Sequence, residues 1–341
     1  MKSRIFLFLL AFPMLAGSLI GQTAPAATPS AAQNMPAKPS SPPDAKTQAP
    51  APPENPAKSD SDESVTTIVH VVNEVRVVFT VTDRHGHYIK DLKEDDFRVI
   101  DDKMPAELRS FRSETDLPLQ VGLLVDASNS VRDRFKFEQE AAIEFLNAII
   151  RPHYDKAFVV GFDATPEVTQ DFTDDTGNLS AGVRMLRPGG GTALYDALYF
   201  ACRDKLLKQE QTGPVRRAII LLSDGEDNLS HVTREEAIEM AERADTIVYT
   251  ISTNISGMKG KGDKVMERIA EATGGRAFFP FQMRDVADAF LSIQEELRSQ
   301  YWVAYKPANF VADGRYRAIE ILAQDRNLKV RTRKGYYAPK Q

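Results

Sequence analysis

Residues 121–130 read Val-Gly-Leu-Leu-Val-Asp-Ala-Ser-Asn-Ser, a short apolar run that ends in small polar side chains. A continuous apolar run of this length suits a strand that is covered on both faces, as in a parallel sheet. Outward along the chain, three more such runs lie at 157–160, 218–222 and 246–251. Together these four runs predict the central strands of one parallel sheet.

Helical periodicity separates these runs. Apolar side chains recur every three or four positions over residues 135–150, 194–206, 237–244 and 286–297, which is the spacing of one helix face. Strands that alternate with helices are typical of a doubly wound α/β sheet. We therefore predict an α/β domain with a mostly parallel, Rossmann-like sheet over residues 117–300.

Strand-like segments lie on both sides of this α/β region. Runs rich in β-branched and aromatic residues, the signature of strands, precede it at 68–72, 75–81 and 97–100 and follow it at 301–305, 316–321 and 328–331. Neither flank has enough strands for a stable sheet of its own. Because chain termini often lie close together, we predict that residues 64–116 and 301–341 pair into one small β-sandwich.

The first 63 residues differ in composition from the rest. Residues 1–21 carry Lys2 and Arg4, then an apolar run and small residues, as in an export signal. That run is shorter than the roughly 20 residues of a spanning helix, so we predict no membrane span in the mature chain. Residues 22–63 hold ten prolines, all between positions 25 and 56, and are expected to form a disordered spacer. The chain is thus expected to be exported, either secreted or held in the periplasm or cell envelope.

Charge and cysteine content exclude several classes of protein. The 43 basic and 48 acidic side chains give a net charge of −5, which is not the basic footprint of a nucleic-acid-binding protein. A single cysteine excludes an internal disulfide framework and a cysteine-based zinc site. This residue, Cys202, falls on the apolar side of the helix predicted at 194–206 and is expected to be a core residue.

Oxygen-bearing side chains gather where the predicted strands end. Asp126, Ser128 and Ser130 follow the first run, Asp224 follows the run at 218–222, and Thr192 follows three glycines directly before a helix. In doubly wound sheets, ligands bind beyond the carboxyl ends of the strands. A set of oxygen donors without His or Cys favours magnesium, manganese or calcium. We predict that these five residues hold a divalent cation, with magnesium preferred, and that an open coordination position can accept a carboxylate.

This arrangement resembles the metal-ion-dependent adhesion site (MIDAS) of von Willebrand factor A (VWA) domains, with all five positions filled. The resemblance covers about residues 117–300. The wider layout, including Phe79-Thr80-Val81-Thr82-Asp83, 190–196 and Gly335-Tyr336-Tyr337, is similar to a secreted bacterial family of such proteins. The resemblance implies a metal-dependent, adhesion-type module that binds an Asp or Glu side chain of a protein ligand, and not an enzyme.

Two other functions remain open from the residues alone. Asp126 could be the nucleophile of a magnesium-dependent hydrolase or phosphotransferase, although position 128 is Ser where a second acid is expected. The ion could instead only stiffen the loops of an envelope scaffold. For Ser130 there is also a local alternative, namely capping of the helix that follows.

Residues near this cluster carry weaker expectations. Glu226 and Asp227 are expected either to support the ligands from behind or to be charges at the rim, and Asn129 to orient waters on the ion. The segment 257–262, rich in Gly and Lys, lacks the Gly-Lys-Ser/Thr ending of a phosphate loop and is predicted to be a mobile loop on the same rim. Its lysines, Lys259 and Lys261, together with Lys264, are hypothesised to select an acidic partner.

Overall fold

The computed structural model describes residues 74–339 except 114–116, 133, 211–212 and 255. The predicted export signal, the spacer and the strand at 68–72 lie outside the described residues. The described part of the chain belongs to one compact unit, residues 68–341. Within it, no helix is both long and apolar enough to cross a membrane.

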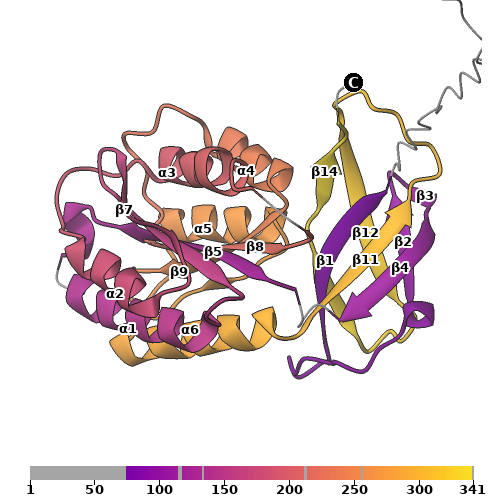
Figure 1. The fold of residues 1–341 in the computed structure, drawn as a ribbon, viewed down its shortest axis with the longest axis horizontal. Coiled ribbons are helices and arrows are strands. Elements are labelled where there is room, and N and C mark those ends of the chain that lie inside the picture. The colour runs from indigo at the N-terminus through magenta and orange to yellow at the C-terminus, as the bar shows by residue number, and fades with distance from the viewer. Residues whose placement is uncertain (1–73, 114–116, 133, 211–212, 255, 340–341) are drawn as a thin grey trace, which may run out of the picture. The chain divides into compact units, whose positions relative to one another are not determined.

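The centre of the α/β region is a six-stranded sheet with the order β10-β9-β8-β5-β6-β7 (Figure 1). Its parallel strands are β5 (Leu119–Asp126), β6 (Lys156–Phe162), β8 (Arg216–Ser223), β9 (Thr246–Ser252) and β10 (Ala277–Phe278). At the other edge, β7 (Pro166–Thr173) runs antiparallel to β6. The four predicted apolar runs are β5, β6, β8 and β9, so the prediction of a mostly parallel sheet is confirmed.

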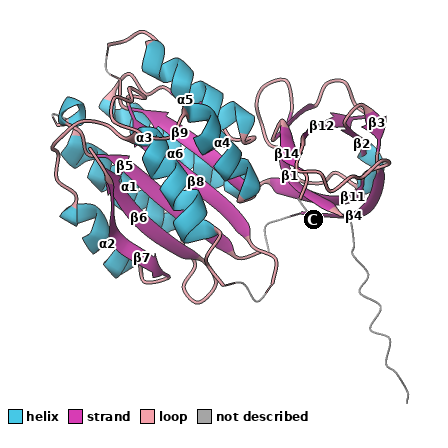
Figure 2. Ribbon diagram, turned by 90° about the horizontal axis from the view of Figure 1, so that it is seen from above, coloured by secondary structure: helices cyan, strands magenta, loops and turns pink. Residues whose placement is uncertain are grey.

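Helices cover both faces of this sheet (Figure 2). One apolar cluster joins the sheet to α1 (Phe135–Ile149), α2 (Thr176–Met185) and α6 (Met283–Leu297). The opposite cluster joins it to α3 (Leu194–Phe200), η4 (Ala201–Leu206), α4 (Arg234–Arg243) and α5 (Lys261–Ala272). Burial on both faces explains the unbroken apolar runs. Cys202 is fully buried in the second cluster, as predicted.

Two helices, α2 and α5, were not predicted, although α5 buries an apolar face that includes Met266, Ile269 and Ala270. In α2, Asp175 caps the first turn by accepting hydrogen bonds from the backbone N–H groups of Gly177 and Asn178. In α5, Asp263 accepts a hydrogen bond from the Gly260 N–H over 2.7 Å. The segment predicted as a loop at 257–262 therefore ends inside a helix, which begins at Lys261.

The two flanks pair with each other. Strand β1 (Val75–Thr82) pairs with β11 (Gln300–Lys306), and β2 (Phe97–Asp101) with β12 (Tyr316–Ala323), both antiparallel. A short 3₁₀ helix, η1 (Glu94–Asp96), precedes β2. The sheets have the orders β13-β1-β11-β4 and β14-β12-β2-β3, completed by β3 (Met104–Pro105), β4 (Glu107–Ser113), β13 (Lys329–Thr332) and β14 (Gly335–Tyr337). Each sheet thus contains strands from both flanks, as predicted, around a shared apolar core.

Two buried carboxylates hold the flanking strands. Asp101 accepts hydrogen bonds from the Tyr305 and Tyr336 hydroxyls over 2.8 and 2.9 Å and pairs with Arg317. On α6, Glu296 accepts hydrogen bonds from the Tyr88 and Tyr249 hydroxyls, both over 2.8 Å, and pairs with Arg331 of β13. Buried charges are stable only when they are paired and hydrogen-bonded, and both carboxylates meet this condition.

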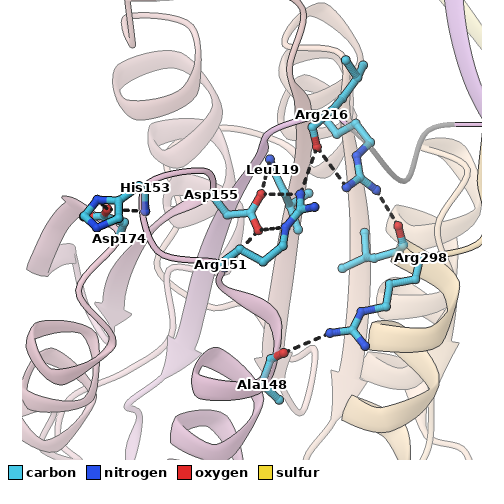
Figure 3. A network of polar contacts seen from close by, with 10 residues as sticks. Leu119, Ala148, Arg151, His153, Asp155, Asp174, Arg216 and Arg298 are labelled. Carbon is cyan, nitrogen blue, oxygen red and sulfur yellow. Dashed lines mark hydrogen bonds and ion pairs between the residues drawn. The ribbon is translucent and has the colours of Figure 1, made fainter.

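A polar network anchors the amino ends of the central strands (Figure 3). The buried carboxylate of Asp155 accepts hydrogen bonds from the Leu119 N–H over 2.8 Å and from the Arg151 guanidinium over 2.7 and 2.9 Å. Arg216, the first residue of β8, donates to the Leu297 carbonyl over 2.5 Å. This end of the sheet is therefore fixed by its own side chains, while the carboxyl ends carry the cluster of oxygen donors.

Candidate metal centre

Two neighbouring strands bring Asp126 and Asp224 to the same edge of the sheet. Strands β5 and β8 are parallel and directly paired, with Val125 opposite Leu222. Asp126 is the last residue of β5 and is fully buried, whereas Asp224 follows β8 and is partly exposed. The predicted placement of the two carboxylates on adjacent strand ends is therefore correct.

Asp126 is held by hydrogen bonds to both of its carboxylate oxygens. Oδ1 accepts from the Ser128 N–H over 2.8 Å, and Oδ2 accepts from the Ser223 hydroxyl over 2.6 Å. Burial raises the pKa of Asp126 to about 6, these hydrogen bonds oppose the rise, and the charge of Asp224 adds to it. A buried carboxylate of this kind lacks positive charge, which a cation would supply.

Ser128 and Ser130 lie in the loop after β5, and their side chains point at each other. Their hydroxyl oxygens are 2.9 Å apart, and Ser130 lies in a short 3₁₀ turn, η3 (Asn129–Val131). Helix α1 begins later, and its N-cap residue is Arg134, which makes no side-chain cap hydrogen bond. The alternative that Ser130 caps this helix is therefore wrong, and its hydroxyl instead contacts that of Ser128.

The glycine-rich loop before Thr192 joins the other two loops. The Gly189 N–H donates to the Ala127 carbonyl over 2.6 Å, and the Thr192 N–H donates to Asn228 Oδ1 over 3.0 Å. Thr192 is buried at 4% exposure, and its hydroxyl forms no hydrogen bond within the described residues. Gly190 has a φ of +67°, and a Cβ there would lie 2.9 Å from Asp163 Oδ2. The loop needs glycine to reach this position.

The start of α5 packs against Asp224. A Cβ on Gly225, whose φ is +79°, would lie 2.2 Å from the Gly262 carbonyl oxygen, so the two backbones touch. Next to this contact is a cleft of about 390 Å³. Its lining includes Ser130, Asp224, Glu226, Thr253, Asn254 and Asp263. The Gly- and Lys-rich segment thus lies beside the candidate metal centre, as predicted.

Of three neighbouring side chains, Asp227 and Asn129 make contacts that were not predicted. Asp227 accepts hydrogen bonds from the Tyr195 N–H at the start of α3 and from the Ser230 hydroxyl. The Asn129 amide donates to the Gly190 carbonyl over 3.2 Å and accepts from Arg132, so it links loops. Glu226 is exposed at the rim, as expected.

Sequence reasoning missed Ser223 and Asn228, which fix Asp126 and Thr192. The available signal for Ser223 was its place as the last residue of an apolar run, directly before Asp224. The donor set itself consists of two carboxylates and three hydroxyls on three loops that hydrogen bonds join. Oxygen donors of this kind fit a hard divalent cation.

Comparisons with known proteins identify a family and a curated relative. Residues 121–226 match the family described as von Willebrand factor type A domain. Among curated proteins, calcium-activated chloride channel regulator 1 of Bos taurus is 30% identical over 169 residues. The matched part covers 47% of this chain, and this chain covers only 17% of that relative's length.

Solved structures are similar at low sequence identity. A von Willebrand factor type A structure from Catenulispora acidiphila has a TM-score of 0.47 and 13% identity, covering 79% of this chain and 74% of that one. Proximal thread matrix protein 1 from the mussel byssus, described with a zinc-occupied MIDAS motif, has a TM-score of 0.47 and 16% identity. That similarity covers 58% of this chain and 50% of the mussel chain.

Proposed function

Since residues 121–226 of this chain belong to the von Willebrand factor type A family, we propose that the protein is a metal-dependent binding module for other proteins. The observation that carries this proposal is the meeting of three loops at the carboxyl edge of the sheet. These loops carry two carboxylates and three hydroxyls, and two of the residues concerned, Ser130 and Asp224, line one cleft. The module is proposed to act outside the cytoplasm, since residues 1–21 have the composition of an export signal.

The proposed ligands are Asp126, Ser128, Ser130, Thr192 and Asp224. Magnesium is the preferred ion, and manganese or calcium could replace it because all donors are oxygens. When bound, the ion would supply positive charge that attracts and coordinates a carboxylate. The five proposed ligands leave a coordination position open. An Asp or Glu side chain of the partner would bind the ion there.

The surface next to the cleft supports an acidic partner. Lys261 and Lys264 are exposed on the first turns of α5, which begins beside Asp224. Lys259 is less available, because its ammonium pairs with Glu267 over 3.0 Å and lies 3.9 Å from the centre of the Phe279 ring. We therefore assign the selection of acidic partners to Lys261 and Lys264 within the predicted lysine group.

Binding is favoured over phosphoryl or hydrolytic chemistry by the composition of the cleft. A phosphotransferase needs cationic groups that hold the phosphate and a general acid or base beside it. No lysine, arginine or histidine is among the described residues that line this cleft. Asp126, the nucleophile of the enzyme alternative, is also fully buried.

A pull-down tests the proposed function against the structural-ion alternative. Immobilised wild-type chain and Asp224→Ala would each be incubated with envelope extract in magnesium and in excess chelator. The proposal expects a protein that is retained only by the wild type and only in magnesium. A partner retained equally well in chelator would instead support a scaffold in which the ion only stiffens the loops.

A further inference from the structure

A buried ion pair joins the N-cap residue of α1 to the first turn of that helix. Arg134 is 7% exposed and Glu138 is 1% exposed, and Arg134 Nε lies 3.3 Å from Glu138 Oε1. Within the described residues, neither the guanidinium nor the carboxylate has a hydrogen-bond partner outside this pair. Buried polar atoms are normally hydrogen-bonded to protein or to ordered water. The pair therefore lacks the partners that its burial requires.

The pair directly follows the turn that carries Ser130: the Arg134 N–H donates to the carbonyl of Val131, the last residue of that turn, over 3.1 Å, and the Glu138 N–H donates to the Arg134 carbonyl over 3.1 Å. Burial raises the pKa of Glu138 to about 7, Arg134 opposes the rise, and the charges of Asp126 and Asp224 both add to it. Three carboxylates, of which Asp224 is partly exposed, thus interact with one another and with one guanidinium. Their two net negative charges equal the charge that one divalent cation would neutralise.

We propose that Glu138 is an outer carboxylate of the metal centre, which accepts hydrogen bonds from water on the cation while Arg134 balances its charge. Water on a hard cation is a strong donor, and such ions usually keep some of their water. It would satisfy the Glu138 oxygens and separate them from Asp126 and Asp224. This inference rests on the proposed cation. It adds a positioning residue on α1 to the five proposed ligands.

Calorimetric titration of the full chain with magnesium and manganese tests this role. Carboxylates that orient metal ligands or metal-bound water typically contribute 10- to 100-fold in affinity, so Glu138→Gln is expected to weaken cation binding about tenfold. Glu140→Gln changes an exposed carboxylate on the same helix and is expected to bind like the wild type. Wild-type affinity in Glu138→Gln would overturn the inference.

Replacement of Arg134 distinguishes this role of Glu138 from a purely structural one. At pH 8, Arg134→Gln removes a positive charge that repels the cation, so its cation affinity is expected to equal or exceed that of the wild type. Its melting temperature in chelator is expected to fall, because Glu138 loses its counter-ion. If Arg134→Gln weakens cation binding as much as Glu138→Gln does, the pair acts only through the fold and the inference is wrong.

A variant that retains the ion pair guards against misfolding. Glu138→Asp keeps the charge beside Arg134 but withdraws the carboxylate by one methylene group, so it should fold and still bind the cation several-fold more weakly. The rise in melting temperature on adding magnesium reports the same affinity. An unchanged rise in Glu138→Asp contradicts the inference. If the wild type itself binds no cation, the proposed function fails instead.

Discussion

The Ser223 hydroxyl donates a 2.6 Å hydrogen bond to Oδ2 of Asp126 and also accepts one from the Gly225 N–H over 3.0 Å. One buried side chain thereby joins the end of β5 to the turn that carries Asp224. The relative position of the two proposed carboxylate ligands is therefore set inside the protein, before any ion binds.

Removing this hydroxyl should weaken cation binding. In Ser223→Ala, Asp126 loses a hydrogen bond to its charged form, which is worth roughly 1.5–3 kcal/mol. We expect magnesium affinity to fall by about tenfold or more while the fold is retained, since a free-energy change of 1.4 kcal/mol corresponds to a factor of ten. Titration calorimetry measures this. Ser256→Ala, at an exposed position on the far side of the cleft, should match the wild type, and equal affinity in both variants would be contrary to this account.

Cation binding should weaken in mild acid. In the cation-free protein the pKa of Asp126 is raised from 3.8 to about 6. Its ionisation therefore opposes folding fully above about pH 6, and this cost disappears as the pH falls toward 3.8. Because the cation needs the ionised carboxylate, magnesium affinity should be constant above about pH 8, where Glu138 is ionised as well, and fall about tenfold per pH unit well below pH 6. Affinity that stays constant down to pH 4.5 would be inconsistent with Asp126 as a ligand.

The contact between the Asp224 turn and α5 can be tested with two glycines. Gly225 and Gly257 have similar φ angles of +79° and +75°, but only at Gly225 would a Cβ meet another backbone. Gly225→Ala should displace the Asp224 turn, lowering stability by about 2–3 kcal/mol and weakening cation binding. Gly257→Ala isolates the cost of the positive φ. Thermal melts with and without magnesium compare them, and identical losses would show that the backbone contact has no role.

Glu296 should matter for stability but not for cation binding. Its replacement by Ala leaves Arg331 without its counter-ion and two tyrosine hydroxyls, of Tyr88 and Tyr249, without their acceptor. Breaking a buried pair in this way costs about 3–5 kcal/mol. Chemical denaturation should show this loss, whereas the exposed neighbour variant Glu295→Ala should be close to the wild type. A loss below 1 kcal/mol for Glu296→Ala would contradict the packing described above.

Most of the correct predictions came from the apolar runs and from the residues at which these runs end. Strands β5 and β8 were recognised because both their faces are buried, and this placed Asp126 and Asp224 on one edge. Helix α2 and the edge strand β7 were missed because half-exposed elements show no clear apolar pattern. The apolar face of α5, which includes Met266, Ile269 and Ala270, was present in the sequence and was overlooked. The positions of these elements depend on contacts distant in sequence, such as the Gly225–Gly262 approach.

The position of Glu138 in the helical pattern of α1 is a further signal in the sequence. Glu138 lies three residues after Phe135 and four before Ala142, the spacing of one helix face, and both neighbours were predicted to be apolar core. A charged residue at such a position is a signal in the sequence. The identity of its partners, in contrast, depends on how α1 packs on the sheet, which no local pattern specifies.

Calorimetric titration of wild-type protein and Asp126→Ala with magnesium and manganese tests the central claim most directly. The account predicts saturable binding of one cation by the wild type and none by Asp126→Ala, with both proteins equally folded in chelator. Equal binding by the two proteins, or binding by neither, would contradict the proposed metal centre.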